Sequence, residues 1–141
     1  MGARTTRKLR GICLGLFACL ILSACGDMQK VAINGILDDR DSAVSSGDIG
    51  AYSRLLLRDY QDHGQTKVTV VARMINLFSQ FDSTQMKSFD RHVKLIDDHH
   101  AQCEQSYHLK VQKDGDWREI TQREQLYLTR TAAGWRISGG L

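Results

Sequence analysis

The fold of this 141-residue chain is decided by the stretch Ala43-Val44-Ser45-Ser46-Gly47-Asp48-Ile49-Gly50-Ala51-Tyr52, which separates two runs of helical periodicity. The sequence Ser45-Ser46-Gly47 favours a break in a helix, and Asp48 is a residue type that caps helix amino termini. We therefore predict one helix that ends near Ser45 and a second that begins at Ile49.

Three helices with one apolar face each are predicted around this break. The first extends back to about Met28, and the second reaches about Leu57. The third begins after the capping residue Thr66, beyond a turn at Asp62-His63-Gly64. The apolar residues with helical spacing are Val31, Ile33, Ile36, Leu37 and Val44, then Tyr52, Leu55 and Leu56, then Val68, Val71, Ile75 and Phe78.

After Ser83 the hydrophobic period changes from that of a helix to that of a strand. Turn sequences divide this part of the chain, among them Lys113-Asp114-Gly115-Asp116 and Thr131-Ala132-Ala133-Gly134, which are typical of hairpins. An α+β fold with an antiparallel meander follows. The predicted strands lie near residues 87–97, 102–112, 117–130 and 135–139.

Three segments together resemble a known superfamily. They are residues 43–52, Arg58-Asp59-Tyr60-Gln61-Asp62-His63-Gly64 and Gly134-Trp135-Arg136-Ile137. Their order and spacing resemble the nuclear transport factor 2-like proteins, which include polyketide cyclases and steroid isomerases. The resemblance covers nearly all of residues 28–139 and implies a cystatin-like cone, in which three helices pack on a curved antiparallel sheet of about four strands. Isomerases, dehydratases, cyclases and non-catalytic binding domains share this fold, so activity stays open.

The amino terminus carries a second pattern. A basic segment precedes an apolar run from Gly11 to Leu22, which is too short to span a bilayer and is typical of a signal peptide. The small pair Ser23-Ala24 before Cys25 resembles the lipobox of bacterial lipoproteins, which is cleaved before a lipid-bearing cysteine. An ordinary secretory signal that contains a cysteine is the alternative. The basic residues are Arg4, Arg7, Lys8 and Arg10.

Cleavage before Cys25 would divide the chain into a lipoprotein signal peptide (1–24), a lipidated cysteine with a very short tether (25–27) and a single domain (28–141). Each buried methylene of a lipid contributes about 0.8 kcal/mol, so two or more acyl chains hold a protein on a membrane. We therefore expect Cys25 to anchor the protein in the bacterial cell envelope. In enteric lipoproteins an aspartate after the cysteine marks retention in the inner membrane. Because Gly26 follows Cys25 here, the resemblance implies the outer membrane, facing the periplasm.

Removal of the signal peptide changes the charge and the cysteine content. Loss of its four positive charges takes the formal net charge from +3 to −1. No basic stripe remains, so we expect no nucleic-acid partner. Of the four cysteines, Cys13 and Cys19 leave with the signal peptide and Cys103 is the single remaining free thiol. Because Cys103 has the strand parity of Tyr107, we expect it to be buried and inert.

Strand alternation also places polar residues on the face of the sheet that is predicted to pack against the helices. Arg91, Gln105 and Glu124 have this parity, and a charged group there is costly unless it is paired. Arg91 and Glu124 therefore either form a structural ion pair or line a small-molecule pocket together with Gln105 and Tyr60. A β-bulge would reverse the parity of one strand. The apolar residues of the set are Phe89, Val93, Leu95, Cys103, Tyr107, Leu109, Val111, Ile120, Leu126, Leu128, Trp135 and Ile137.

The sequence assigns no catalytic residue, cofactor or metal ligand. Side chains of the turn Asp97-Asp98-His99-His100 are adjacent along the chain, and adjacent residues rarely point at one ion, so we expect a solvated turn. Steroid isomerases of this fold use a tyrosine in the first helix, and this chain has none there.

The expected function is that of a lipid-anchored envelope protein whose domain binds a small apolar molecule or a protein partner without catalysis. Two alternatives remain open. The first is an isomerase or dehydratase that uses Glu124 or His108 as a base. The second is an interaction module that forms a homodimer through the outer face of the sheet.

Overall fold

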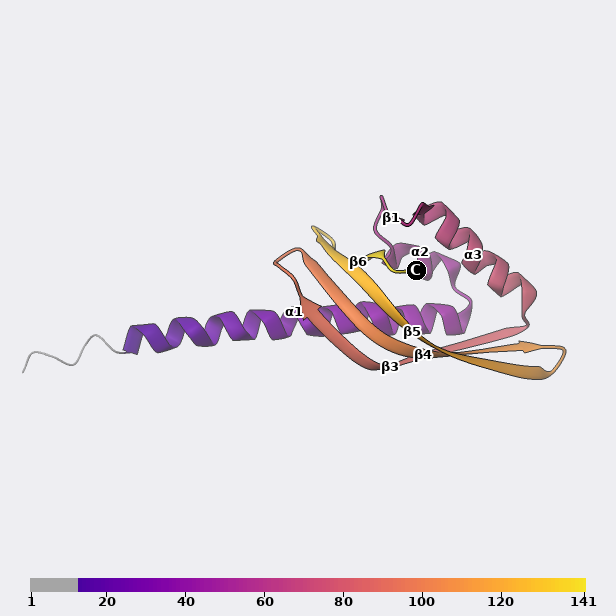
Figure 1. The fold of residues 1–141 in the computed structure, drawn as a ribbon, viewed down its shortest axis with the longest axis horizontal. Helices are drawn as coiled ribbons and strands as arrows, with labels where there is room; N and C mark the ends of the chain where they lie inside the picture. The colour runs from indigo at the N-terminus through magenta and orange to yellow at the C-terminus, as the bar shows by residue number, and fades with distance from the viewer. Residues whose placement is uncertain (1–12) are drawn as a thin grey trace, which may run out of the picture.

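The computed structural model describes residues 13–141, and side chains from Cys25 onward. The predicted basic segment of the signal peptide lies outside the described residues. Figure 1 shows a long helix lying against a curved sheet, with two further helices on the same side. The elements are α1 (Cys13–Ser46), α2 (Ile49–Leu55), β1 (Gln61–Asp62), β2 (Gln65–Thr66), α3 (Lys67–Gln80), β3 (Ser83–Leu95), β4 (His100–Lys113), β5 (Asp116–Thr131) and β6 (Gly134–Gly139).

Strands β3 to β6 form one antiparallel sheet in chain order, as the hairpin turns predict. The strands begin and end within a few residues of the predicted bounds, and the largest difference is at β3, which begins at Ser83 instead of residue 87. Gly115 and Gly134 occupy the left-handed region, with φ of 86° and 104°, as hairpin turns require. The three helices and the four-stranded sheet confirm the predicted α+β fold.

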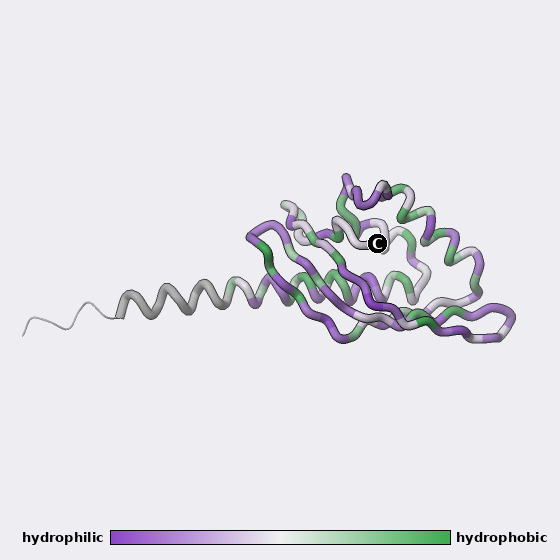
Figure 2. The backbone as a smooth tube through the Cα atoms, in the orientation of Figure 1, coloured by the Kyte–Doolittle hydropathy of each residue, from purple (hydrophilic) through white to green (hydrophobic). Residues whose placement is uncertain are grey.

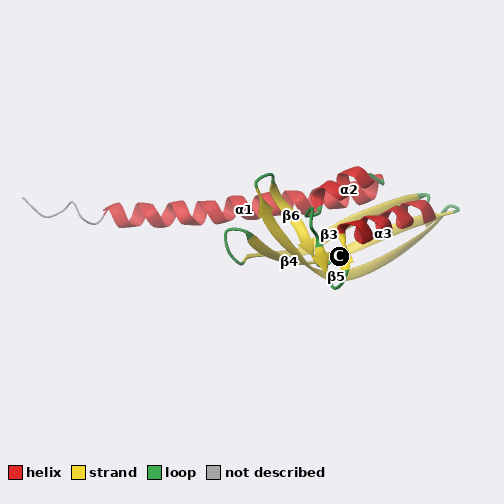
Figure 3. Cartoon of the chain, turned by 90° about the horizontal axis from the view of Figure 1, so that it is seen from above, coloured by secondary structure: helices red, strands yellow, loops and turns green. Residues whose placement is uncertain are grey.

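Helix α1 is longer than predicted. It begins at Cys13 and continues without a break through residues 25–27, where the sequence suggested a tether, because no proline interrupts it. Its first turns project beyond the sheet in both views (Figures 1 and 3). No helix in the described part of the chain is long and apolar enough to cross a membrane.

The domain buries one face of α1. Hydrophilic and hydrophobic residues alternate along this helix (Figure 2), and Ile33, Leu37 and Val44 are almost fully buried. Val31, expected on the same face, is 71% exposed because it lies on the other side of the helix from Ile33. Arg40 occupies a buried position between Leu37 and Val44.

Side chains of α1 bond to the backbone of β3, which is an edge strand of the sheet. The Asp41 carboxylate accepts a hydrogen bond from the backbone N–H of Ser88 at 2.7 Å, and Ser45 Oγ accepts one from the N–H of Met86 at 2.8 Å. Thr84 Oγ1 donates to the carbonyl of Val44 at 2.6 Å. The helix therefore satisfies backbone donors that an edge strand otherwise exposes.

A β-bulge in β3 corrects one predicted orientation. The register with β4 shifts between Phe89 and His92, and Asp90 adopts a positive φ of 54°. Before the bulge the even-numbered residues face the helices, so Phe89 points outward, is 38% exposed and stacks on His108. Its assignment to the helix-facing set was wrong, because alternation cannot be followed through an extra residue.

Helix α3 presents a different face from the predicted one. Val70 is buried, and Val71, Met74 and Phe78 pack against the core. Val68 and Ile75 are 76% and 51% exposed, which contradicts their predicted inward orientation. The spacing of Val68, Val71, Ile75 and Phe78 fits two neighbouring stripes of a helix, and the tertiary contacts select the stripe that contains Val70 and Met74.

Cys103 lies fully buried in the core, as its strand parity predicts. Burial raises the pKa of its thiol from the usual 9.0 to about 11, which lowers the thiolate fraction near neutral pH about 100-fold. We expect Cys103 to resist a thiol-specific reagent in the native protein and to react promptly in denaturant, with mass spectrometry used to follow the label. Equal rates in the two states would mean that Cys103 is accessible.

Candidate functional site

A buried ion pair lies between α1 and the concave face of the sheet. The guanidinium of Arg40 donates two hydrogen bonds to the Glu124 carboxylate, from Nη1 to Oε1 at 2.5 Å and from Nη2 to Oε2 at 3.1 Å. The two side chains are 6% and 11% exposed. Burial alone would lower the pKa of Arg40, but the Glu124 carboxylate outweighs burial and raises that pKa above its usual range.

The pair continues into a chain of hydrogen bonds toward the surface. Gln105 Nε2 donates to Glu124 Oε1 at 2.7 Å, and Gln105 Oε1 accepts from Arg91 Nε at 2.8 Å. Arg91 also reaches α1, where its Nη1 donates to Asp38 Oδ1 at 2.8 Å. Arg40, Glu124, Gln105 and Arg91 are called the polar network below. They join β3, β4 and β5 to α1 through hydrogen bonds among charged and amide groups.

The structure brings together three of the four residues that the sequence proposed for a pocket. Arg91 and Glu124 both belong to the network, and Gln105 connects them, so they do not form a direct ion pair. Tyr60 lies elsewhere, and its hydroxyl accepts a hydrogen bond from the backbone N–H of Leu141 at 3.0 Å. Tyr60 therefore fixes the carboxyl end of the chain, while the other three face α1.

Sequence reasoning missed Arg40, although the sequence contains a signal for it. Arg40 stands in the apolar stripe of α1 with Leu37 and Val44, at spacings of three and four residues. A charged side chain in such a stripe indicates a buried partner. The identity of that partner, 84 residues away along the chain, depends on the register of β5.

Two tyrosines lie beside the ion pair. The guanidinium of Arg40 sits 5.9 Å from the centre of the Tyr107 ring, close enough for a cation–π contact. The Tyr107 hydroxyl donates to Gln122 Oε1 at 2.7 Å. Tyr52 is 2% exposed, and burial raises the pKa of both phenols. Both hydroxyls therefore stay protonated at neutral pH, and that of Tyr107 acts as a hydrogen-bond donor.

The five histidines all lie outside the concave face. His63, His99 and His100 are on turns or strand ends, and His92 follows the bulge on the outer side. His108 is also on the outer face, where Nδ1 is 2.7 Å from Thr121 Oγ1 and 3.0 Å from Glu119 Oε1. Among residues 25–141, no cluster of three or more histidine, cysteine or acidic side chains is placed to hold a metal ion.

The turn between β3 and β4 is closed by Asp97. Its Oδ1 accepts hydrogen bonds from the backbone N–H groups of His99 at 2.7 Å and His100 at 2.8 Å. His100 Nδ1 lies 2.9 Å from both carboxylate oxygens. The side-chain bond from His100, followed by the backbone bonds, lowers the pKa of Asp97.

We expect the Asp97 carboxyl to titrate below its usual pKa of about 3.9 in the folded protein. Because the folded-state pKa is the lower one, the carboxylate stabilises the turn above the usual pKa, and this stability is lost as the pH falls through the lowered value. Carboxyl-carbon NMR measures the midpoint. Replacing His100→Ala should move it upward, and an unchanged midpoint would show that His100 does not contribute.

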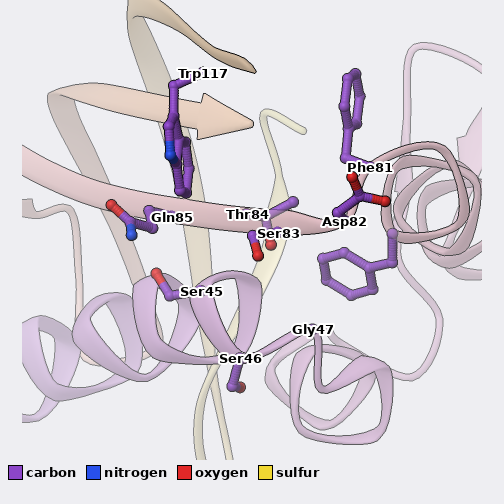
Figure 4. A pocket seen from close by; sticks show the side chains of 10 residues that line it. Ser45, Ser46, Gly47, Phe81, Asp82, Ser83, Thr84, Gln85 and Trp117 are labelled. Carbon is purple, nitrogen blue, oxygen red and sulfur yellow. The ribbon is translucent and has the colours of Figure 1, made fainter. Parts of the chain in front are cut away.

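A separate pocket of about 340 Å³ lies where α1, α3 and β3 meet. Figure 4 shows Trp117 on one side of β3 and Ser45 and Ser46 on the opposite side. Phe81 and Asp82 lie at one end of the pocket. Two of the hydroxyls already have partners, since Ser46 Oγ donates to the carbonyl of Ser42 at 2.9 Å and Ser45 Oγ donates to the carbonyl of Met86 at 3.2 Å. Among the described residues that line the pocket, Asp82 is the one titratable group, and its carboxylate accepts from the N–H of Asp114 at 2.9 Å. This lining offers aromatic surface for binding and a single carboxylate, that of Asp82.

Comparison of the chain with known proteins finds neither a matching protein-family model nor a matching curated protein. Solved structures do match. A protein of Kribbella flavida superposes with a TM-score of 0.72 and 15% identity, covering 82% of this chain and 89% of that one. A candidate dehydratase of the NTF2-like family from Streptomyces avermitilis superposes with a TM-score of 0.70 and 14% identity, covering 81% of this chain and 94% of that one. An NTF2-like protein with a cystatin-like fold from Novosphingobium aromaticivorans superposes with a TM-score of 0.68 and 17% identity, covering 84% of this chain and 83% of that one. Likeness at such identities concerns the fold and carries no activity with it.

Proposed function

Because the chain has the nuclear transport factor 2-like fold, we propose that it is the precursor of a lipid-anchored envelope protein whose cone-shaped domain binds a ligand or partner without catalysis. The anchor is the lipid on Cys25, attached after residues 1–24 are removed. A small apolar molecule is the favoured ligand, and the outer membrane, facing the periplasm, is the favoured location.

The proposal that the domain is not catalytic rests on the hydrogen bonds within the polar network. Glu124 accepts two hydrogen bonds from Arg40 and one from Gln105, so its carboxylate is engaged on both oxygens. General-base catalysis needs a group that is free to take a proton from substrate at hydrogen-bond distance. The side chains of Arg91 and Glu124 are 14% and 11% exposed, so little of either is open to a substrate.

The competing proposal is an isomerase or dehydratase. It is favoured by the structural likeness to proteins described as candidate dehydratases. In that case Glu124 would be the base, because His108 lies on the outer face and cannot reach the concave side. Tyr52 and Tyr107 would supply hydrogen-bond donors near Glu124. Turnover would then require Glu124 to be released from Arg40.

A third proposal is a homodimer through the outer face of the sheet. This face carries exposed ion pairs, for example Arg123 with Glu104 at 3.3 Å and Lys110 with Glu119 at 3.3 Å. It also carries the stack of Phe89 on His108, with ring centres 4.6 Å apart. Mixed charge of this kind is compatible with solvent as well as with a second copy.

Native mass spectrometry of the full chain, expressed in bacteria and released from membranes in mild detergent, tests the proposals together. A lipid mass on Cys25 with a further non-covalent small molecule supports the favoured proposal. A bound molecule that changes chemically during incubation, and no longer does so after Glu124→Gln, favours the enzyme. A dimer without a bound molecule favours the interaction module. A mature chain without lipid would overturn the anchor.

A further inference from the structure

A cleft of about 440 Å³ begins at Cys25 and separates α1 from the turn between β5 and β6. This volume is within the range of small-molecule sites, about 300–1,000 Å³. Cys25 is itself part of its wall and is exposed. The other lining residues are Met28, Gln29, Ala32 and Ile36 of α1, and Arg130, Ala133, Gly134, Trp135 and Arg136 of the hairpin.

The walls of the cleft are chemically divided. Met28, Ala32 and Ile36 follow Cys25 at spacings of three or four residues, so they continue one face of α1 away from the cysteine. Trp135, which is 4% exposed, adds an aromatic side chain opposite them. Two arginines, Arg130 and Arg136, also lie along the hairpin side. An apolar strip beside arginine N–H donors suits an acyl chain whose ester carbonyl lies next to the strip.

The position of Cys25 leaves little freedom to a lipid on its sulfur. Helix α1 continues through Cys25 to Ser46, so no flexible segment separates the cysteine from the folded domain. The side chain of Leu95 lies 3.8 Å from where a Cβ on Gly26 would stand, which places the β3–β4 turn beside the start of the mature helix. A lipid on Cys25 therefore starts within the cleft.

One residue that lines the cleft, Gln29, also has an acceptor without a partner in the described part of the chain. Oε1 of Gln29 is buried and has no hydrogen-bond partner among the described residues. In an α-helix each backbone N–H donates to the carbonyl four residues earlier. Removal of residues 1–24 therefore leaves the N–H of Cys25 without an acceptor within the helix. An N-acylated Cys25 then carries an amide donor one turn from Gln29.

We infer that the cleft between α1 and the β5–β6 turn holds one acyl chain of the lipid attached to Cys25. The inference rests on the proposed lipidation of Cys25. Such binding would orient the domain relative to the membrane. One acyl chain lies along the domain, and the remaining acyl chains enter the bilayer and hold the protein there. The domain then has a fixed end toward the membrane, which contains Cys25 and the turns beside it.

Photo-crosslinking within the lipidated full chain tests this inference. Cells that express the protein are fed a diazirine-bearing fatty acid, and the protein is extracted in non-ionic detergent and irradiated. Intact mass first establishes whether Cys25 carries the labelled lipid, and peptide mapping then locates the crosslinks. We expect them within the α1 segment 28–36 and the hairpin segment 130–136.

Two neighbouring substitutions provide a matched pair. Ala133→Trp places a large side chain in the cleft, whereas Ala132→Trp adds the same side chain at an exposed position that does not line it. The first should reduce crosslinking to α1 about tenfold, equivalent to about 1.4 kcal/mol, and the second should leave it unchanged.

The outcomes separate the two claims. Labelled lipid on Cys25 with crosslinks scattered over the surface, or equally reduced by both substitutions, overturns the cleft and leaves the anchor intact. Absence of lipid on Cys25 overturns the anchor itself. If Ala133→Trp does not fold, the crosslink map of the unsubstituted protein still decides the question.

Discussion

Replacing Glu124→Gln is expected to lower the free energy of unfolding by about 3–5 kcal/mol, because it leaves the Arg40 guanidinium buried without a counter-charge. Arg40 is 5% exposed, and its Nε already has no hydrogen-bond partner among the described residues. The introduced amide oxygen can still accept a hydrogen bond from Gln105, but its NH2 group replaces an oxygen that accepts from Arg40, so the substitution removes both the charge and one hydrogen bond. Denaturant unfolding in mild detergent measures this loss of stability.

Two further variants decide how this loss is to be understood. Arg40→Met combined with Glu124→Gln removes the uncompensated charge, and we expect it to regain most of the stability, because a buried ion pair contributes little compared with apolar packing.

Glu104→Gln removes one partner of the exposed pair with Arg123 on the outer face, where the side chains are 50% and 54% exposed. That change should be within about 0.5 kcal/mol of zero. A similarly small effect of Glu124→Gln would mean that water reaches Arg40.

The second large effect is expected from Cys25→Ala, which removes the proposed lipid. Two or three acyl chains hold a protein on a membrane almost irreversibly, whereas without them only weak surface contacts remain. We therefore expect the protein to leave the membrane fraction almost completely when the mature segment is exported behind a non-lipoprotein signal with this substitution. Fractionation and intact mass give the distribution and the lipid content.

Cys103→Ala is the matched control for the anchor. Its thiol is buried in the core, so the variant should remain in the membrane fraction with its lipid. Unchanged fractionation of Cys25→Ala would contradict lipid anchoring at this cysteine. Loss of the membrane form in both variants would indicate that the exported protein fails to fold.

Local chemistry accounts for what the sequence predicts well. The break after Ser46, the cap at Asp48 and the hairpin glycines at positions 115 and 134 depend on residues that adjoin in the chain. Parity correctly places Cys103 and Gln105 in the interior, because β4 has no bulge. Each of these features follows from backbone preferences that act over a few residues.

Features that depend on distant contacts were not predictable. The bulge that turns Phe89 outward depends on the register between β3 and β4, and local alternation does not report it. Of the candidate site, the sequence placed Arg91, Gln105 and Glu124 on one face but could not pair Glu124 with Arg40, whose neighbour is set by the packing of α1. The sequence also assigned Tyr60 to the candidate pocket. In the structure its hydroxyl accepts a hydrogen bond from the backbone N–H of Leu141.

The hydrogen bonds that Asp41 and Ser45 accept from the backbone of β3 also bear on the order in which the chain becomes available for folding. If the chain is exported as proposed, its amino end emerges first, so both side chains would reach the far side of the membrane before residues 83–95 do. An edge strand that appears without cover is a template for pairing with another unfolded copy. In the proposed exported protein, two backbone donors of the strand would meet side chains of the same molecule that had already crossed, and this order would protect the chain from aggregation.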